Sequence, residues 1–222
     1  MHTTTTSEAA EGRVYGGLSP AERKVRRRDA FLRAGFEVFG TSGFRTATVR
    51  GICHRAGLAT RYFYESFDHM DDLLAAVFEE CIADFRRRLG VTFGRTEVAA
   101  NPQALIRAGL ECFFEWVEDP RVARVCWREV VGVSRPLDDL SRRALQGFAP
   151  MLVQLARAVY PDSRIDDAEA EVTAVAVTGA LAQAALRWHQ GKRRISRETM
   201  VAATSRVLVG IKLTIEADLA GR

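Results

Sequence analysis

The spacing of the apolar residues is the feature that most constrains this chain. From Ser19 onward, hydrophobic side chains recur at intervals of three and four residues over nearly the whole sequence, which is the periodicity of one face of an α-helix. No sustained run alternates apolar and polar residues around an Asn-Gly or Asp-Gly turn, the pattern of a β-hairpin. The sequence therefore predicts an all-α fold of about nine helices.

The composition is that of a folded chain with a disordered start. The 222 residues are 47% hydrophobic and 27% charged, enough apolar material for a core. Residues 1–19 are rich in threonine and glycine without periodicity, which predicts a disordered segment. We expect no signal peptide and no membrane segment, because the longest nearly apolar run, 174–186, is short and contains Thr178, Gly179 and Gln183. A cytoplasmic location is expected.

The sequence contains no motif typical of an enzyme or of a metal site. It contains no GxSxG, P-loop or HExxH motif, so an enzyme is not predicted. We expect no cofactor and no metal, because the four cysteines lack metal-ligand spacing and point to a reducing compartment. The net charge of +4 is consistent with an anionic partner. The cysteines are Cys53, Cys81, Cys112 and Cys126.

Two short helices lie close together near the N-terminus. A first helix is predicted to begin at Ser19 and Pro20, and "GTSG" ends it. Thr48 is a suitable N-cap for a second, short helix, and Gly57 ends that helix because glycine adopts positive φ without strain. A third helix follows at once, through Phe67. This arrangement is a helix-turn-helix.

The third helix divides into an inner and an outer face. Phe63 and Phe67 lie four residues apart and pack inward, which leaves Arg61 and Tyr64 on the other side. An arginine can donate two parallel hydrogen bonds to a guanine edge, and a tyrosine hydroxyl can bind a phosphate oxygen. A group of cations in the first helix can attract DNA independently of its sequence. Such a run is more often a solvated helix face. The cations are Lys24, Arg26, Arg27 and Arg28.

Four motifs in this region carry a family resemblance. They are "AGFEVFGTSGF", "TATVRGICHRAG", "LATRYFYESF" and "HMDDLLAAVFEE". In their order and spacing, residues 29–85 resemble the DNA-binding domain of the TetR family of bacterial transcriptional regulators. The resemblance implies a helix-turn-helix DNA-binding domain at 20–68 and an effector-binding and dimerisation domain at 69–222. It also implies that double-stranded, palindromic operator DNA is the partner.

The resemblance assigns roles residue by residue. Thr48 falls at the helix cap that meets phosphate, and Tyr64 at a phosphate-contacting aromatic. Two positions depart from the family pattern: Ala59 replaces the hydroxyl cap of the recognition helix, leaving Thr60 as an alternative cap, and Met70 replaces a common lysine. The residues predicted to contact DNA are Thr48, Arg50, Thr60, Arg61, Tyr62, Tyr64 and His69.

The C-terminal part gathers aromatic residues on successive predicted helices. Aromatics at helical spacing are more often core than pocket, and Pro150 predicts a kink or break within them. In a family with an effector cavity, however, this set supplies the best candidates to line one. Few charged residues are placed to point inward, which favours an apolar ligand. The candidates are Phe113, Phe114, Trp116, Trp127, Phe148 and Met151.

The last two predicted helices, 167–189 and 196–219, suit a dimer interface. The first is rich in alanine and the second carries an apolar face, so the pair is predicted to form a four-helix contact in a homodimer. Packing within one chain is the alternative. The predicted function is that of a sequence-specific transcriptional regulator, a repressor that a small apolar ligand releases from its operator. The alternatives are a DNA-binding protein without an effector, which organises the chromosome or is controlled by a partner, and a small-molecule-binding helical protein without a DNA function.

Overall fold

The computed structural model describes residues 19–94, 101–163, 165–191 and 194–220, and every regular element in these ranges is helical. The expected all-α fold is therefore confirmed. The elements are α1 (Pro20–Thr41), η1 (Phe44–Thr46), α2 (Val49–Ala56), α3 (Thr60–Tyr64), α4 (Met70–Gly94), α5 (Pro102–Glu118), α6 (Pro120–Arg124), the π-helical segment η2 (Val125–Glu129), α7 (Arg135–Gln146), α8 (Ala149–Val159), α9 (Asp167–Gln190) and α10 (Arg197–Ala220).

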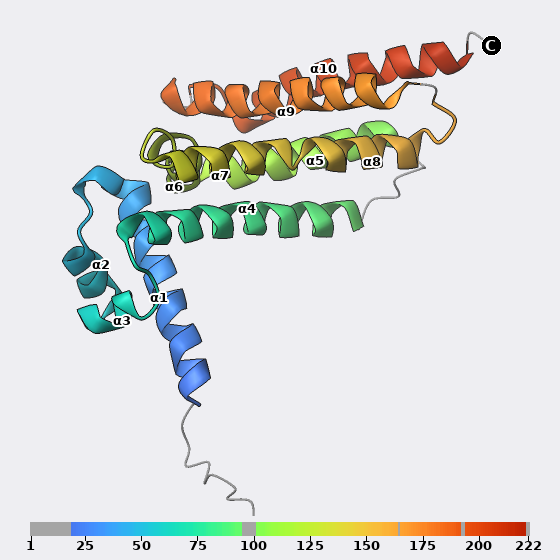
Figure 1. Ribbon diagram of the computed structural model, residues 1–222. Coiled ribbons are helices and arrows are strands. Elements are labelled where there is room, and N and C mark those ends of the chain that lie inside the picture. Colours follow the sequence, from blue (N-terminus) through green and yellow to red (C-terminus); the bar gives the residue numbers. More distant parts are fainter. Residues whose placement is uncertain (1–18, 95–100, 164, 192–193, 221–222) are drawn as a thin grey trace, which may run out of the picture.

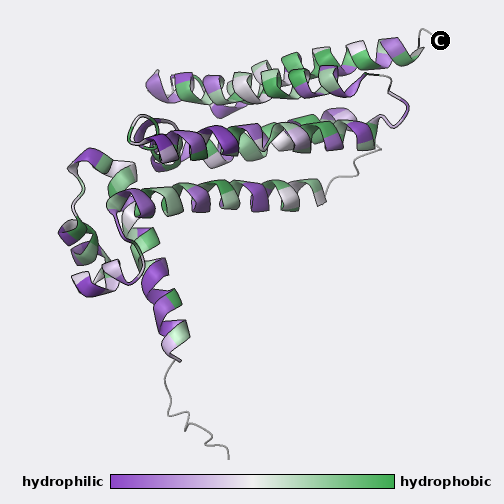
Figure 2. Cartoon of the chain, viewed as in Figure 1, coloured by the Kyte–Doolittle hydropathy of each residue, from purple (hydrophilic) through white to green (hydrophobic). Residues whose placement is uncertain are grey.

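The helices form a stack of layers with a small domain at one end (Figure 1). Helix α4 forms the first layer, α5 to α8 lie above it, and α9 and α10 cover the far side. Helices α1 to α3 lie at the end of the stack where α4 begins. Figure 2 shows hydrophobic and hydrophilic residues interspersed along each helix, as expected when one face of a helix is buried.

The predicted ends of α1 and α2 are confirmed, whereas α3 ends at Tyr64 and not at Phe67 as predicted. The hydroxyl of Ser19 accepts a hydrogen bond from the backbone N–H of Glu22, and the Glu22 carboxylate accepts one from the N–H of Ser19. This capping box satisfies donors that the first helical turn leaves free. Thr48 caps α2 by accepting the N–H of Gly51, and Gly57 ends α2 with φ +68°.

Pro150 divides the predicted long helix, as expected. Helix α7 ends at Gln146, and α8 begins at Ala149 with Pro150 in its first turn, where the missing N–H has no helical partner to lose. Of the two expected outcomes, a kink or a break, the structure shows the break. The described residues contain ten α-helical segments, against about nine helices predicted.

The helix-turn-helix is built around aromatic contacts between α1 and α3. The ring of Phe31 packs edge-to-face on Phe63 at 5.6 Å and on Phe67 at 6.3 Å between centroids. All three rings are buried, as the inward placement of Phe63 and Phe67 predicted. Gly35 allows α4 to approach α1, because a Cβ at this position would lie 3.0 Å from the side chain of Val77. The orientation of α3 is thus set by the core beneath it.

Two sequence predictions concern the residues before α1 and the loop before α4. The predicted disordered segment 1–19 falls, except for Ser19, outside the described residues. The proposed boundary between residues 68 and 69 stays a prediction; it coincides with the loop before α4, which begins at Met70. Among the described helices, none combines the length and the hydrophobicity needed to cross a bilayer.

Candidate functional site

The predicted DNA-contacting side chains lie together on α2, α3 and the start of α4. Helix α3 presents Tyr64, which is 57% exposed, while Phe63 beside it is fully buried. The inner and outer faces inferred from the sequence are therefore those of the structure. Of the predicted contact residues, Tyr62 is half-buried and six are exposed: Thr48, Arg50, Thr60, Arg61, Tyr64 and His69.

The side chain of Tyr62 lies between two arginines. The Arg61 guanidinium lies 4.6 Å from the centroid of the Tyr62 ring, and that of Arg27 lies 4.4 Å from it. Arg61 also donates a hydrogen bond to the Tyr62 hydroxyl at 2.7 Å, and this bond raises the pKa of Arg61. Tyr62 therefore orients Arg61 on the exposed face, where its remaining N–H donors are free to meet a base edge.

Two of the cations expected to attract DNA have structural roles. Arg27 forms an ion pair with Glu65 at 3.1 Å, in addition to its contact with Tyr62. Arg28 donates a hydrogen bond to the carbonyl of Ser66 and lies 4.5 Å from the centroid of the Phe67 ring. Both side chains connect α1 to the end of α3. Their positive charge still contributes to the field around α3, but these contacts hold the recognition helix in place.

Two details at the ends of α3 and α4 refine the predictions. Helix α3 begins after Ala59 without a side-chain cap; the alternative cap Thr60 is the first helical residue, so that expectation is wrong. At the start of α4, the backbone N–H of His69 donates to the Asp72 carboxylate at 2.8 Å. His69 itself is exposed.

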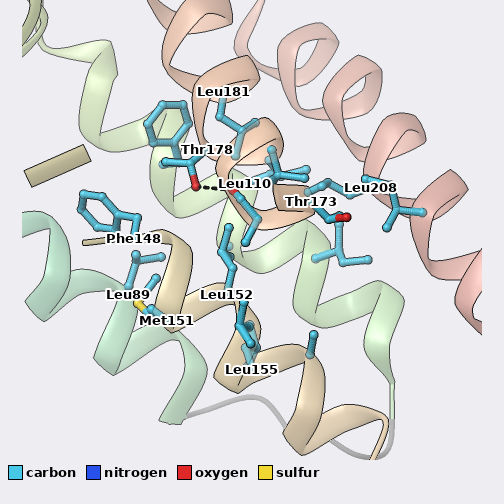
Figure 3. A pocket seen from close by; sticks show the side chains of 18 of the residues that line it. Leu89, Leu110, Phe148, Met151, Leu152, Leu155, Thr173, Thr178, Leu181 and Leu208 are labelled. Atoms are coloured by element: carbon cyan, nitrogen blue, oxygen red, sulfur yellow. Dashed lines mark hydrogen bonds between the residues drawn. The ribbon is translucent and has the colours of Figure 1, made fainter. Parts of the chain in front are cut away.

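A large apolar cavity lies between α4, α5, α8, α9 and α10. Its volume is about 530 Å³, within the range of cavities that hold small ligands. Figure 3 shows Leu110, Leu152 and Leu208 pointing into it from three of these helices. Because the lining is mostly aliphatic and aromatic, the cavity suits an apolar ligand, as the sequence indicated.

Five of the six aromatic and methionine candidates line this cavity, and one does not. The correction is Phe114, which is fully buried and packs edge-to-face on Trp188 at 5.8 Å. Consecutive residues on a helix point about 100° apart, so Phe113 faces the cavity while Phe114 faces α9. The five lining candidates are Phe113, Trp116, Trp127, Phe148 and Met151.

The aromatic rings form the end of the cavity nearest to α1. Phe85 of α4 stacks on Trp116 at 4.6 Å between centroids and contacts Phe148 at 5.4 Å. Trp127 of η2 packs edge-to-face on Trp116 at 6.1 Å. Side chains from four helical segments therefore meet here, and Trp127 shows that η2 belongs to the cavity wall.

The other end of the cavity is polar. Tyr160, just beyond α8, donates a hydrogen bond to Glu216 at 3.0 Å, and Lys212 donates to the same carboxylate at 2.7 Å. Burial and the neighbouring Glu216 raise the pKa of Tyr160 to about 12. The bonds from Lys212 and Tyr160 lower the pKa of Glu216. Tyr160 and Lys212 line the cavity, so the polar end offers hydrogen-bonding partners to a ligand.

The contribution of α9 and α10 to the cavity was missed in the sequence. The sequence predicts a dimer contact for these helices, with packing within one chain as the alternative, and in the structure one face of each lines the cavity. The signal was the run of small residues in α9, which leaves space beside it. Lining residues on these helices include Thr173, Ala174, Val177, Thr178, Leu181, Leu208 and Ile211.

The opposite face of α9 and α10 exposes apolar side chains. Val172 of α9 is 68% exposed and Val207 of α10 is 61% exposed. Val175 and Leu213 are also more than half exposed. An added Cβ at Gly210 would meet no atom within 4 Å. Exposed apolar side chains on adjacent helices are typical of a surface that another molecule covers.

The described residues contain no group of three or more His, Cys, Asp and Glu side chains able to hold a metal ion. Two buried thiols, Cys81 and Cys126, lie in contact, and their mutual hydrogen bond together with burial raises the pKa of Cys126. A buried thiol with a raised pKa is a poor nucleophile at neutral pH. These cysteines are therefore packing residues.

Comparison with known proteins places residues 31–77 in the family described as bacterial regulatory proteins, tetR family. Over 203 residues the chain is 25% identical to the HTH-type transcriptional activator FasR of Mycolicibacterium smegmatis, covering 90% of each chain.

Solved structures share the whole fold. The fatty acid degradation regulator FadR of Bacillus halodurans superimposes with a TM-score of 0.72 at 17% identity, over 87% of this chain and 97% of that one. The transcriptional regulator FadR of Bacillus subtilis, in complex with stearoyl-CoA, gives 0.67 at 18% identity, over 81% and 95%.

Proposed function

We propose that this chain, a transcriptional regulator of the TetR family, is a dimeric repressor that an elongated apolar ligand releases from its operator. The observation that carries the proposal is the pairing of two surfaces in one chain. An exposed helix-turn-helix face lies at one end, and a cavity of about 530 Å³ lies in the adjoining helices. The alternatives without an effector or without DNA each leave one of these surfaces without a role.

The DNA-contacting roles follow from the exposed face. We propose that Arg61 and Thr60 read base edges in the major groove, because they project from the recognition helix. Tyr62 orients Arg61 through the bond described above. The remaining contacts, from Thr48, Arg50, Tyr64 and His69, go to phosphates, which position the protein but carry no sequence information. Such a protein acts in the bacterial cytoplasm, where its DNA lies.

The shape of the cavity supports an elongated ligand with a polar head group. The lining runs along α8 from Phe148 to Tyr160, a distance of about 18 Å at the rise of an α-helix. An extended chain of about fifteen carbon atoms fits this length, because each bond of about 1.5 Å advances a zigzag chain by about 1.3 Å. Tyr160 and Lys212 at the polar end suit a polar head group. A fatty acyl derivative has this form, and the similar FadR of Bacillus subtilis was solved with stearoyl-CoA.

Release from DNA follows from the placement of α4. This helix begins beside α3 and lines the cavity with Phe78, Phe85 and Leu89. In a homodimer held by α9 and α10, a ligand that moves α4 changes the distance between the two recognition helices. A palindromic operator has a fixed spacing between its two half-sites. After such a change, the dimer can place only one recognition helix in its half-site.

A specific observation favours activation as the second candidate. The curated relative FasR is named a transcriptional activator. The same ligand and operator contacts serve an activator when the ligand-bound form is the one that binds DNA. The direction of the effect on operator affinity separates the two.

The test begins with selection of the operator from genomic DNA by the purified protein. Operator affinity is then measured with and without stearoyl-CoA, with acetyl-CoA as the control that shares the head group and lacks the chain. We expect stearoyl-CoA to weaken binding by about tenfold or more and acetyl-CoA to leave it unchanged. A gain in affinity would establish the activator. If neither these compounds nor free fatty acids bind in the cavity, the effector proposal is wrong.

A further inference from the structure

One short helical segment touches both the cavity and the DNA-binding domain. The π-helical segment η2 follows α6 directly and spans Val125–Glu129. Its Cys126 and Trp127 line the cavity. Glu129, at its end, contacts the turn after α1, and so does Arg124, just before it. Short π-helical turns inside α-helices are rare and occur frequently at functional sites.

Glu129 is the only buried charged residue among those the structure describes, with 8% of its surface exposed. One carboxylate oxygen accepts the backbone N–H of Phe44 at 2.7 Å, and the other accepts from the Arg124 guanidinium at 2.7 Å. A buried carboxylate is stable only when it is paired and hydrogen-bonded. Moving Glu129 away from these partners therefore has a large energetic consequence.

Arg124 extends this contact to the end of α1. Its guanidinium donates to the carbonyl of Thr41 and, at 3.2 Å, to that of Ser42. These carbonyls lie in the last turn of α1, where they have no helical donor. Gly43 completes the turn with φ +95°, and a Cβ there would lie 2.4 Å from the Arg124 guanidinium. Arg124 thus binds carbonyl groups of the turn Thr41–Phe44, and Glu129 binds a backbone N–H of the same turn.

The turn Thr41–Phe44 leads directly into the helix-turn-helix. Residues Phe44–Thr46 form η1, and Thr48 caps α2. The ring of Phe44 packs on Phe39 of α1 at 5.6 Å. The position of the turn therefore sets where α2 begins relative to α1, and with it the phosphate-facing Thr48.

We propose that η2 couples the cavity to the DNA-binding domain, with Glu129 and Arg124 as positioning residues. A ligand that displaces Trp127 favours the ordinary α-helical form of η2. Changing the register by one residue turns the following side chains by about 100° around the helix axis. The hydrogen bond between the Phe44 N–H and the Glu129 carboxylate then breaks, and the turn before α2 loses this contact with η2. The two helical forms of η2 supply the discrete states that coupling requires.

This route reaches the turn before α2 through η2, which also contacts α4 at Cys81, and it rests on the proposed function only in taking the cavity as the ligand site. The first experiment compares wild type with Glu129→Gln, in which an amide oxygen still accepts the Phe44 N–H but the charge that pairs with Arg124 is gone. The control is Glu111→Gln, which removes an exposed carboxylate paired with Arg107 on α5.

Operator affinity is measured with and without stearoyl-CoA, and ligand binding is followed by tryptophan emission. Stearoyl-CoA is expected to lower the operator affinity of wild type and of Glu111→Gln by about tenfold or more. It is expected to lower that of Glu129→Gln by less than about twofold, although Glu129→Gln still binds the ligand. Arg124→Lys, which keeps the charge and loses the forked contacts, is expected to behave as Glu129→Gln does. A wild-type response in both variants overturns the proposal.

A second experiment needs no ligand and uses amide hydrogen exchange of the full-length protein. Trp127→Ala is expected to accelerate exchange of the Phe44 amide several-fold, because η2 loses its cavity anchor. Leu152→Ala, which opens the cavity from α8, is expected to leave that amide unchanged. Exchange at Phe114, in the core of α5, corrects for global unfolding.

Unchanged exchange at Phe44 in Trp127→Ala would overturn the coupling role of η2. If wild-type operator affinity does not respond to stearoyl-CoA, the proposed effector is wrong. The exchange experiment still decides whether η2 connects the cavity to the DNA-binding domain, so the two failures are distinguishable.

Discussion

The carboxylate of Glu129 accepts a hydrogen bond from the backbone N–H of Phe44 at 2.7 Å, although the two residues lie 85 positions apart in the chain. The bond joins the helical layer around the cavity to the turn that precedes the helix-turn-helix. Because the carboxylate is buried and also paired with Arg124, it adds a polar contact between the two regions to the packing of α1 on α4 and α6.

The turn beneath this contact has no room for a larger residue. We expect Gly43→Ala to lower the free energy of unfolding by about 2–3 kcal/mol, because alanine is strained at φ +95° and would displace Arg124. Gly57→Ala is the matched control: its φ is +68°, but no atom lies within 4 Å of the added Cβ, so a smaller loss of about 1 kcal/mol is expected. Urea unfolding measures both, and equal losses would contradict the packing argument.

Arg61 and Tyr64 are expected to differ in what they recognise. Arg61→Ala should weaken binding to the specific operator by about 1–3 kcal/mol and relax the sequence preference. Tyr64→Phe should weaken all DNA sequences similarly, since a phosphate contact carries no base information. Binding selection with each variant, followed by affinity measurements on matched and scrambled sites, distinguishes the two. The same sequence-independent loss in both variants would remove Arg61 from the base-reading residues.

The exposed apolar face of α9 and α10 is expected to form the dimer contact. Light scattering should give about twice the chain mass of 24.6 kDa. Val207→Glu should yield monomers and lose operator affinity, because a charge buried in an apolar interface is unfavourable. Val91→Glu introduces the same charge at an exposed valine of α4 and should remain dimeric. A monomeric wild-type protein would exclude this assembly.

Filling the cavity is expected to separate ligand binding from DNA binding. Val177 lines the cavity from α9, so Val177→Phe should weaken stearoyl-CoA binding about tenfold and leave operator affinity within about twofold. Val91→Phe, on the outer face of α4, should bind as wild type does. Tryptophan emission follows the titration, and loss of the signal in Trp127→Phe would identify the reporter. Unaltered binding by Val177→Phe would place the ligand elsewhere.

Tyr160 is expected to make stability depend on pH in the alkaline range. Its pKa in the folded protein is about 12, against an ordinary value of 10.0. A raised pKa means that the folded state holds the phenol proton more tightly, so this stabilisation is complete below pH 10 and is lost as the pH rises through 12.

The comparison variant is Tyr160→Phe, which cannot titrate. Urea unfolding should show wild type as the more stable protein at about pH 9, with the difference shrinking by about pH 11.5. Glu216→Gln should bring the titration of Tyr160 back toward its ordinary range. A difference that does not vary with pH would mean that Tyr160 does not exchange its proton in this range.

Local structure in the N-terminal region was predictable because its causes lie within a few residues. Ser19, Thr48 and Gly57 begin or end helices through contacts with neighbours three or four positions away. The four-residue spacing of Phe63 and Phe67 decides which side of α3 is buried. The same locality explains why Arg61 and Tyr64 could be assigned to the exposed face.

The sequence does not predict a residue's environment when its neighbours come from another layer of helices. Phe113 and Phe114 are equivalent in the sequence, yet one lines the cavity and the other packs on Trp188. The sequence groups Arg27 with cations that attract DNA or form a solvated helix face, but its partners Tyr62 and Glu65 belong to α3 and its C-cap.

The sequence by itself determined the helices, their apolar faces and the exposure of Arg61 and Tyr64 on α3, because helical periodicity and capping are short-range effects. Only the tertiary structure decided that α9 turns one face to the cavity and another to solvent, and that Glu129 meets Phe44. A cavity exists where side chains from several helices fail to fill the space between them. That outcome depends on how the layers are placed, and helix periodicity carries no information about it.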